Sequence, residues 1–168
     1  MARFDYVRKN YDPTVISYLA GIIDGEGSLY IGNFSSNIKT GKPYYQTCMQ
    51  VTNTDEPLID WLINQFGGLK STRTPRQHAS NSRRQVYSWI ATGDRLTHLC
   101  ELILPFLICK RRQCEILLAM RATYKQTYGS KGRQGLQEMP DELRAYRQSL
   151  MDEIRSLHIR TFSYKKTD

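Results

Sequence analysis

The pattern of apolar and polar residues near the start of the chain predicts a helix followed by a β-hairpin. Asp12 has the form of a helix N-cap and Pro13 suits the first helical turn, so we predict a helix that runs to about Ile23. β-forming residues then lie on both sides of a polar turn. The predicted turn is Ser35–Pro43, and the predicted strands are Leu29–Phe34 and Tyr44–Thr52.

The middle of the chain repeats this helix-and-hairpin pattern. A second helix is predicted at Pro57–Phe66, begun by Thr54 or Asp55 and ended by the Gly-Gly pair that follows. A second hairpin comes next, with a polar and basic tip. Its predicted strands are Leu69–Arg76 and Gln85–Thr92, and its predicted tip is Gln77–Arg84.

The remainder of the chain predicts three more helices. Asp94 can cap a helix that runs to about Leu104, where Pro105 breaks it. Apolar residues at helical spacing then predict a long amphipathic helix and a final helix, separated by a loop rich in glycine and basic residues. The predicted ranges are Lys110–Tyr128 for the amphipathic helix, Gly129–Gly135 for the loop and about Asp141–His158 for the final helix.

This order of elements predicts the fold class. Two hairpins interleaved with helices favour an α+β domain, in which an antiparallel β-sheet carries helices on one face and leaves the other face free. A chain of 168 residues is long enough for one domain with a substantial core. We therefore expect a single domain over residues 1–168.

Composition favours a polyanionic partner. The chain has 24 Lys and Arg against 16 Asp and Glu, a formal net charge of +8. Basic side chains that neutralise phosphates release condensed counterions, so this excess suits nucleic acid without separating DNA from RNA. The 11 tyrosines can both stack and donate hydrogen bonds at an interface.

The lack of a recognisable targeting signal and the pattern of cysteines predict an intracellular protein, in the cytoplasm or an organelle matrix. Residues 1–13 are charged and lack the apolar core of a secretory signal, and the longest apolar stretch is too short to span a membrane. No C-x-x-C pair is present. We expect buried, reduced thiols at Cys48, Cys100, Cys109 and Cys114; zinc binding by Cys109, Cys114 and His98 is the less favoured alternative.

The most informative segment is Tyr18–Ser28, with the sequence Tyr-Leu-Ala-Gly-Ile-Ile-Asp-Gly-Glu-Gly-Ser. Small residues at Ala20 and Gly21 would let another helix backbone approach closely, and the acids Asp24 and Glu26 follow them. A small-residue helix face that ends in acids places carboxylates where two helices meet. A helix that ends in Asp-Gly is also ordinary C-terminal chemistry.

This segment resembles the signature of the LAGLIDADG homing endonucleases, with Glu26 where the family name has Asp. The order of elements agrees with the family's αββαββα core, so the resemblance covers about residues 13–128, and 129–168 would form a helical extension. It implies a saddle-shaped sheet. Because only one motif is present, it also implies a homodimer through the motif helix. The implied interface residues are Leu19, Ala20, Gly21, Ile23 and Asp24.

The resemblance also implies metal-dependent cleavage of DNA. Glu26 and the Gly25 carbonyl are the expected metal ligands, while Asp24 is expected to shape the helix end. Mg²⁺ is the expected cofactor, with Mn²⁺ or Ca²⁺ as substitutes. Lys110 stands five residues after Pro105, as in the family, and an ammonium there would stabilise negative charge.

Asn53 ends the second strand where the family places a polar residue that orders water. A strand-end turn former is an almost equal interpretation of Asn53. The family tends to offer a further basic residue just beyond this position. Here Thr54, Asp55, Glu56 and Pro57 follow, so the basic shell expected from the family is incomplete.

Sheet residues are the expected DNA readers, because alternate residues of a strand share a face. Gln can pair with adenine and Arg with guanine in the major groove, whereas other basic residues would contact only phosphates. Trp89 fits a core position as well as a DNA contact. The expected DNA-binding residues are Tyr30, Gly32, Phe34, Gln46, Gln50, Arg73, Arg76, Arg83, Arg84, Gln85, Tyr87, Arg111 and Arg112.

These features predict a sequence-specific double-strand DNA endonuclease, typically encoded within an intron, that acts on a long pseudo-palindromic site. Two alternatives remain open at this point. One is an RNA maturase of the same fold that assists intron splicing. The other is a basic nucleic-acid-binding protein without catalytic activity.

Overall fold

A computed structural model gives the arrangement of residues 7–34, 44–74, 84–127 and 140–158. The elements follow the predicted order. They are α1 (Pro13–Glu26), β1 (Gly27–Phe34), β2 (Tyr44–Asn53), α2 (Glu56–Phe66), β3 (Leu69–Arg73), β4 (Val86–Thr92), α3 (Gly93–Ile103), the 3₁₀ turn η1 (Leu104–Phe106), α4 (Arg111–Thr127) and α5 (Asp141–His158). The predicted turn at 35–43 and loop at 129–135 lie outside the described residues.

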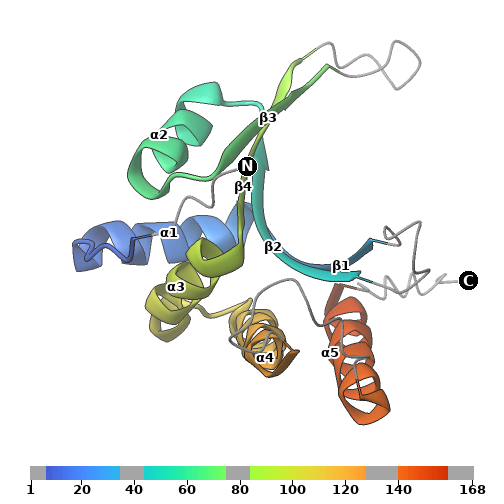
Figure 1. Ribbon diagram of the computed structural model, residues 1–168. Helices are drawn as coiled ribbons and strands as arrows, with labels where there is room; N and C mark the ends of the chain where they lie inside the picture. Colours follow the sequence, from blue (N-terminus) through green and yellow to red (C-terminus); the bar gives the residue numbers. More distant parts are fainter. Residues whose placement is uncertain (1–6, 35–43, 75–83, 128–139, 159–168) are drawn as a thin grey trace, which may run out of the picture.

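The strands form one antiparallel sheet in the order β1-β2-β4-β3. The two hairpins are therefore joined through β2 and β4, which pair from Cys48 with Thr92 to Asn53 with Tyr87. Figure 1 shows a curved sheet with all five described helices on one side and, within the described ranges, no helix on the other. The predicted α+β class with one open face is confirmed.

Local signals explain where several helices begin and end. The Asp12 carboxylate accepts a hydrogen bond of 2.7 Å from the backbone N–H of Thr14, which confirms the predicted N-cap. Gly67 and Gly68 have φ of 65° and 117° and end α2. Asp94 was expected to cap α3, but the N-cap is Thr92 and Asp94 lies in the first turn, where its carboxylate contacts Arg121.

The core lies between the helices and the covered face of the sheet. In β2 the buried residues Tyr45, Thr47, Met49 and Val51 alternate with Gln46, Gln50 and Thr52, which are half-buried on the other face. Trp89 is fully buried, and its Nε1–H donates 2.6 Å to the Gly67 carbonyl. Of the two interpretations of Trp89, the structure therefore selects the core position.

The helix α5 is part of this core. Leu150, Met151 and Ile154 are buried, and the Arg147 guanidinium, 5% exposed, donates to the Thr123 side chain and carbonyl on α4. The predicted final helix is confirmed with its bounds, and it packs against the sheet and α4.

Candidate active site and nucleic-acid interface

The C-terminal end of α1 holds the two motif acids in different environments. The helix runs three residues further than predicted, to Glu26, so both acids lie in its last turn. The Asp24 carboxylate accepts three backbone hydrogen bonds from the segment before α4. The donors are the N–H groups of Ile108 at 2.7 Å, Cys109 at 3.2 Å and Lys110 at 2.9 Å. Asp24 therefore holds the segment that precedes α4 against the end of α1.

Lys110 completes this junction from the other side. Its ammonium donates to the carbonyls of Ile23 at 2.8 Å and Asp24 at 2.7 Å. The last carbonyls of a helix have no partner within the helix and carry the negative end of its dipole, which favours a cation there. The fold thus brings Lys110 to the acidic motif across 86 residues of sequence.

Glu26 stands apart from this junction. Its side chain is exposed, and within residues 7–34, 44–74, 84–127 and 140–158 no hydrogen bond or ion pair joins it to another residue. Gly25 beside it is also exposed, and a Cβ there would meet nothing within 4 Å. None of the described residues therefore competes with a ligand for the Glu26 carboxylate.

Gly27 fixes the direction in which the chain leaves α1. A Cβ at Gly27 would lie 2.7 Å from both the Cα and the carbonyl oxygen of Ile23, closer than real side chains approach. The backbone N–H of Gly27 instead bonds the carbonyls of Ile22 and Ile23. The glycine permits the tight passage from helix to strand that places Glu26 at the junction.

Asn53 lies beyond Val51, which pairs with Gly27, so the end of β2 runs beside the end of α1. The Asn53 side-chain oxygen accepts 2.9 Å from the backbone N–H of Asp55. The turn-forming role was one of the two interpretations of Asn53 from the sequence, the other being to order water. The hydrogen bond to Asp55 uses the side-chain oxygen of Asn53 as its acceptor.

These residues fit a divalent cation by their chemistry. Hard cations take carboxylate and carbonyl oxygens, and the end of α1 offers the Glu26 carboxylate and the Gly25 carbonyl at the negative end of a helix. The described ranges contain no group of three or more His, Cys, Asp or Glu that could hold a metal on its own. Water, phosphate or a second chain would be suitable sources of further ligands.

The open face of the sheet is polar. The register of β1, β2 and β4 places side chains of the expected readers on this face, together with residues that sequence reasoning had not selected. Its central residues are Tyr30, Gly32, Gln46, Cys48, Gln50, Thr52, Ser88 and Ile90. Tyr30, Gly32, Gln46 and Gln50 are therefore brought together as predicted, while Thr52 and Ser88 are additions.

Two of the expected readers point the other way. Tyr87 shares the covered face with Trp89, and Lys70 lies over its ring at 5.4 Å. The nearby Glu56 carboxylate raises the pKa of the Tyr87 hydroxyl. Gln85 accepts 2.9 Å from that hydroxyl and so belongs to the same side. Tyr87 and Gln85 therefore lie on the covered face and not on the open face with the other expected readers, because strand alternation fixes which residues share a face but not which face is covered.

The arginines that were expected to contact DNA differ in their surroundings. Arg73 and Arg84 are exposed near the open end of the second hairpin, whereas Arg76, Arg83 and the side chain of Phe34 lie outside the described residues. Arg111 donates 3.2 Å to the Pro105 carbonyl. Arg112 was expected to contact phosphate, but its guanidinium bonds Glu153 at 2.7 Å and Glu115 at 3.2 Å, and these carboxylates raise its pKa. Arg112 instead joins α4 to α5.

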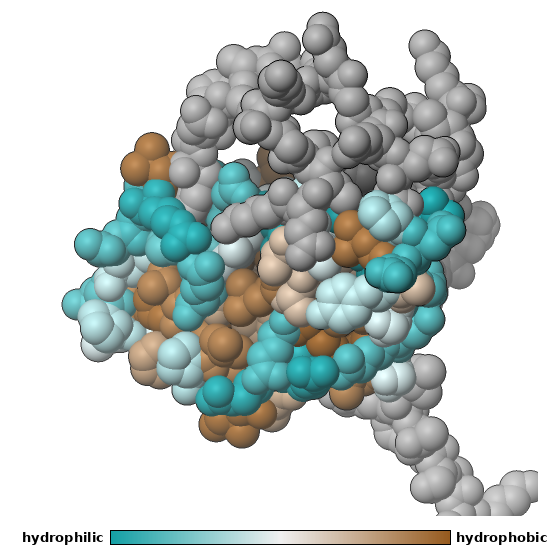
Figure 2. All heavy atoms as spheres, turned by 60° about the horizontal axis from the view of Figure 1, so that its bottom comes forward, coloured by the Kyte–Doolittle hydropathy of each residue, from teal (hydrophilic) through white to brown (hydrophobic). Residues whose placement is uncertain are grey.

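The exposed face of α1 differs from the predicted interface. Leu19, Ala20 and Ile23 are at most 1% exposed and pack in the core of their own chain, so their assignment to an interface is corrected. Gly21 is exposed, and a Cβ there would meet nothing within 4 Å. Exposed apolar side chains are present on α1 and on the nearby segment 104–110: Tyr18, Phe106 and Ile108. Figure 2 shows hydrophobic residues among hydrophilic ones on the left of the molecule, where α1 and α3 lie in Figure 1.

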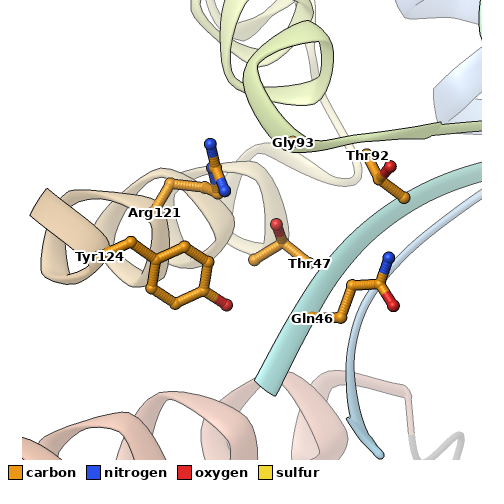
Figure 3. A pocket seen from close by; sticks show the side chains of 6 residues that line it. All are labelled: Gln46, Thr47, Thr92, Gly93, Arg121 and Tyr124. Carbon is orange, nitrogen blue, oxygen red and sulfur yellow. The ribbon is translucent and has the colours of Figure 1, made fainter. Parts of the chain in front are cut away.

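A polar hollow of about 150 Å³ lies elsewhere, where β4 ends beside β2. Figure 3 shows its lining: Gln46, Thr47, Thr92, Gly93, Arg121 and Tyr124. The Arg121 guanidinium already bonds Asp94 at 2.6 Å and Thr97 at 2.9 Å, and the Tyr124 hydroxyl donates 2.6 Å to the Tyr45 carbonyl. None of the motif acids lines this hollow.

The cysteine prediction is right for three residues and wrong for one. Cys48, Cys100 and Cys114 are buried free thiols, and burial raises the pKa of Cys48. Cys109 is exposed, because it lies in the turn whose backbone is bound by Asp24. No helix in the described ranges is long and apolar enough to cross a membrane.

Solved structures with a similar fold are homing endonucleases. I-CvuI, solved with a DNA target in the presence of Mg, matches with a TM-score of 0.67 and 17% identity over 90% of this chain and 88% of that chain. The archaeal intron-encoded I-Vdi141I, solved with DNA, gives 0.64 and 15% over 92% and 89%. I-TnaI gives 0.59 and 13% over 89% and 97%. No protein-family model and no curated protein matches the chain.

These likenesses establish the fold, an α+β domain built on one curved antiparallel sheet. The chain has the fold of the LAGLIDADG homing endonucleases, and the resemblance carried by residues 19–27 is confirmed at the level of the fold.

Proposed function

We propose that the chain is a single-motif LAGLIDADG homing endonuclease: a homodimer that cuts double-stranded DNA at a specific, pseudo-palindromic site with a divalent metal ion, Mg²⁺ in the first place. One observation carries the proposal. The carboxylate of Glu26 is exposed at the end of α1, next to the carbonyls that hold the Lys110 ammonium, and beside an open polar sheet. The neighbours support it, since I-CvuI was solved with DNA in the presence of Mg and of Ca, and I-Vdi141I is intron-encoded.

Each residue of the junction takes a separate role. Glu26 and the Gly25 carbonyl would hold the metal ion, which when bound supplies positive charge at the scissile phosphate and an activated water. Lys110, held by two carbonyls of α1, presents an ammonium that stabilises negative charge developing on the phosphate oxygens. Asp24 positions Lys110 by bonding its backbone N–H. Asn53 shapes the turn at the end of β2 and flanks the site.

The exposed face of α1 would form the dimer interface. Gly21 and Gly25 lie four residues apart, one helical turn, and both leave open space on the surface of the isolated chain. Such a pair permits close approach of a second helix backbone. Tyr18, 56% exposed, and Ile108, 87% exposed, would supply apolar contacts around them. Pairing through this helix brings two copies of Glu26 together, one for each DNA strand.

The open face of the sheet would bind the DNA. Arg73 and Arg84 are exposed cations near the end of the second hairpin and are suited to phosphates, which position a protein without reading sequence. Tyr30, Gln46 and Gln50 offer hydrogen-bonding groups from adjacent strands to base edges.

The decisive experiment uses the uninterrupted DNA sequence that flanks the gene's own insertion point. The purified dimer is incubated with this duplex with and without Mg²⁺, and cutting of both strands is followed by electrophoresis. Glu26→Gln should abolish cutting and keep specific binding measured in Ca²⁺, because the amide keeps shape but loses the charge that holds metal. Glu142→Gln on α5 removes an equally exposed carboxylate far along the chain and should cut normally.

Two results would contradict the proposal. Full cutting by Glu26→Gln would remove Glu26 from the chemistry. Wild-type protein that binds nucleic acid but shows no metal-dependent cutting would instead support an RNA maturase or a non-catalytic binding protein, and an assay of intron splicing separates those two.

A further inference from the structure

The outer segment of β2, residues 44–47, has β1 on one edge and, among the described residues, no strand on the other. β4 pairs with β2 only as far as Cys48, which lies opposite Thr92, and the chain then turns into α3. Gln46, one of the expected DNA readers, belongs to this outer segment. Gln50 lies further along, where β2 has a strand on both edges. The position of Gln46 therefore depends on what holds the edge that β4 leaves open.

A side chain of α4 bonds this edge. The Tyr124 hydroxyl donates 2.6 Å to the Tyr45 carbonyl, and Figure 3 shows the ring reaching from α4 toward β2. That carbonyl belongs to the peptide bond that joins Tyr45 to Gln46. Because a peptide group is planar, a bond to its oxygen also orients the nitrogen of Gln46. Tyr124 thus holds the backbone directly before the reader.

The ring of Tyr124 is itself fixed by two cations. The guanidinium carbons of Arg121 and Arg147 lie over it, 5.1 Å and 4.8 Å from its centre. Arg121 is held by Asp94 at 2.6 Å, and Arg147, which is 5% exposed, is held by Thr123 at 2.8 Å. Cation–π contacts are stronger where the cation is desolvated, as for Arg147. The direction of the Tyr124 hydroxyl is therefore set before any DNA binds.

The helix α5 holds the same strand residue by its side chain. The hydroxyl of Tyr45, which is 4% exposed, donates 3.0 Å to Gln148 Oε1, and Gln148 Nε2 donates 2.9 Å to Asp152. Tyr45 is therefore bound by α4 through its carbonyl and by α5 through its side chain. Gln46 is half-buried, and within the described ranges no hydrogen bond joins its amide to another residue, so the amide remains available to a base.

We propose that Tyr124 and Gln148 are specificity-determining positioning residues, which hold the outer segment of β2 in place of a strand and so fix where Gln46 meets the DNA. A bidentate pair of glutamine with adenine needs both hydrogen bonds aligned, so a shift of the backbone before Gln46 weakens discrimination at its base pair. The polar hollow beside this edge gives room for such a shift. This inference rests on the proposed DNA-binding function.

The test is a binding selection from a randomised duplex library in Ca²⁺. Gln46→Ala and Gln50→Ala first identify the base pair that each glutamine reads. Tyr124→Phe then keeps the ring under its two guanidiniums and removes only the hydroxyl. Discrimination at the Gln46 position should fall by about threefold or more, while the Gln50 position should change by less than about twofold, because β2 is paired on both edges there.

Two further variants accompany Tyr124→Phe. Tyr146→Phe is the matched control, since it removes a hydroxyl from an exposed side chain of α5 and should keep the wild-type profile at both positions. Gln148→Leu removes the bond from α5 and should relax the Gln46 position as well, by a smaller factor. Thermal denaturation shows whether each variant is folded. If Tyr124→Phe does not fold, the profile of Gln148→Leu decides.

The outcomes separate this inference from the proposed function. Wild-type protein without sequence-specific DNA binding would refute the proposed function, and this inference with it. Three results would overturn the positioning role and leave the endonuclease proposal standing. They are no base pair relaxed by Gln46→Ala, an unchanged profile in the folded variants, and a loss of discrimination spread evenly over all positions, which a purely structural role would produce.

Discussion

Substitution of the two motif acids should have different effects, one on the stability of the protein and the other on catalysis. Asp24 binds three backbone N–H groups of the segment before α4, whereas Glu26, two residues along, binds none of the described residues. Asp24→Asn should therefore destabilise the protein. Glu26→Gln should leave stability unchanged and stop cutting.

The magnitude follows from the hydrogen bonds. An asparagine keeps one acceptor oxygen, so one side of the carboxylate is lost and an NH₂ group faces a backbone N–H. Hydrogen bonds to charged groups contribute about 1.5–3 kcal/mol each, and the Ile108 and Cys109 donors lie on exposed residues, where water can replace a lost partner. We expect Asp24→Asn to lower the free energy of unfolding by about 1.5–3 kcal/mol. For a chain of this size that is a fall in Tm of roughly 3–12 °C.

The control is Glu26→Gln, which removes the same charge as Asp24→Asn but should not lower stability. Glu26→Gln removes a negative charge from the C-terminal end of α1, where the helix dipole is also negative, so stability should stay within about 0.5 kcal/mol or rise slightly. Unfolding is followed by circular dichroism in urea at fixed protein concentration, because dimerisation would make stability depend on concentration. Cutting is measured on the same preparations.

Two results would refute this reasoning. Equal stability of the Asp24→Asn and wild-type proteins would mean that the three hydrogen bonds do not hold the junction. A large loss of stability in Glu26→Gln would mean that its carboxylate has structural partners and is not free for a metal ion.

Three further predictions test the same region. Gly21→Leu should favour the helix of the monomer by about 1 kcal/mol yet halve the mass seen in sedimentation, because its side chain fills the space for a second helix; Ala122→Leu, at an exposed position of α4, is the control and should stay dimeric. Lys110→Met should slow cutting by about 10²-fold with binding in Ca²⁺ nearly unchanged, and an equal fall in both would make Lys110 only a phosphate anchor. Gly27→Ala should cost about 1–3 kcal/mol in urea unfolding, since a methyl group would lie 2.7 Å from the Ile23 backbone; unchanged stability would show that the junction can relax.

Local signals in the sequence were sufficient to predict the order of the helices and strands. The Asp12 cap, the glycine pair after α2 and the apolar spacing of α5 act through neighbours a few residues away, so they could be read without the fold. The resemblance also associated Lys110 with the motif, and the Lys110 ammonium does bond the carbonyls of Ile23 and Asp24, although no local rule in the sequence indicated this contact.

The sequence could not predict which face of the sheet, covered or open, each set of side chains would occupy. Period-two alternation places Tyr87 with Trp89 and Gln46 with Gln50, but it is equally consistent with either set facing the helices. The packing of α2 against β4 buries Trp89 and decides the matter. On α1 the family resemblance implied that Leu19 and Ile23 lie at an interface, whereas both fill the core of their own chain.

By itself, the sequence determined the order of helices and strands and the alternation of each strand, because these depend on contacts within a few residues. Only the tertiary structure decided which groups the motif acids meet. Asp24 finds its donors 84 to 86 residues away, and Arg112 finds Glu153 at a separation of 41. Such pairs form because packing of the helices on the sheet brings distant backbone and side chains together, and no local pattern encodes that distance.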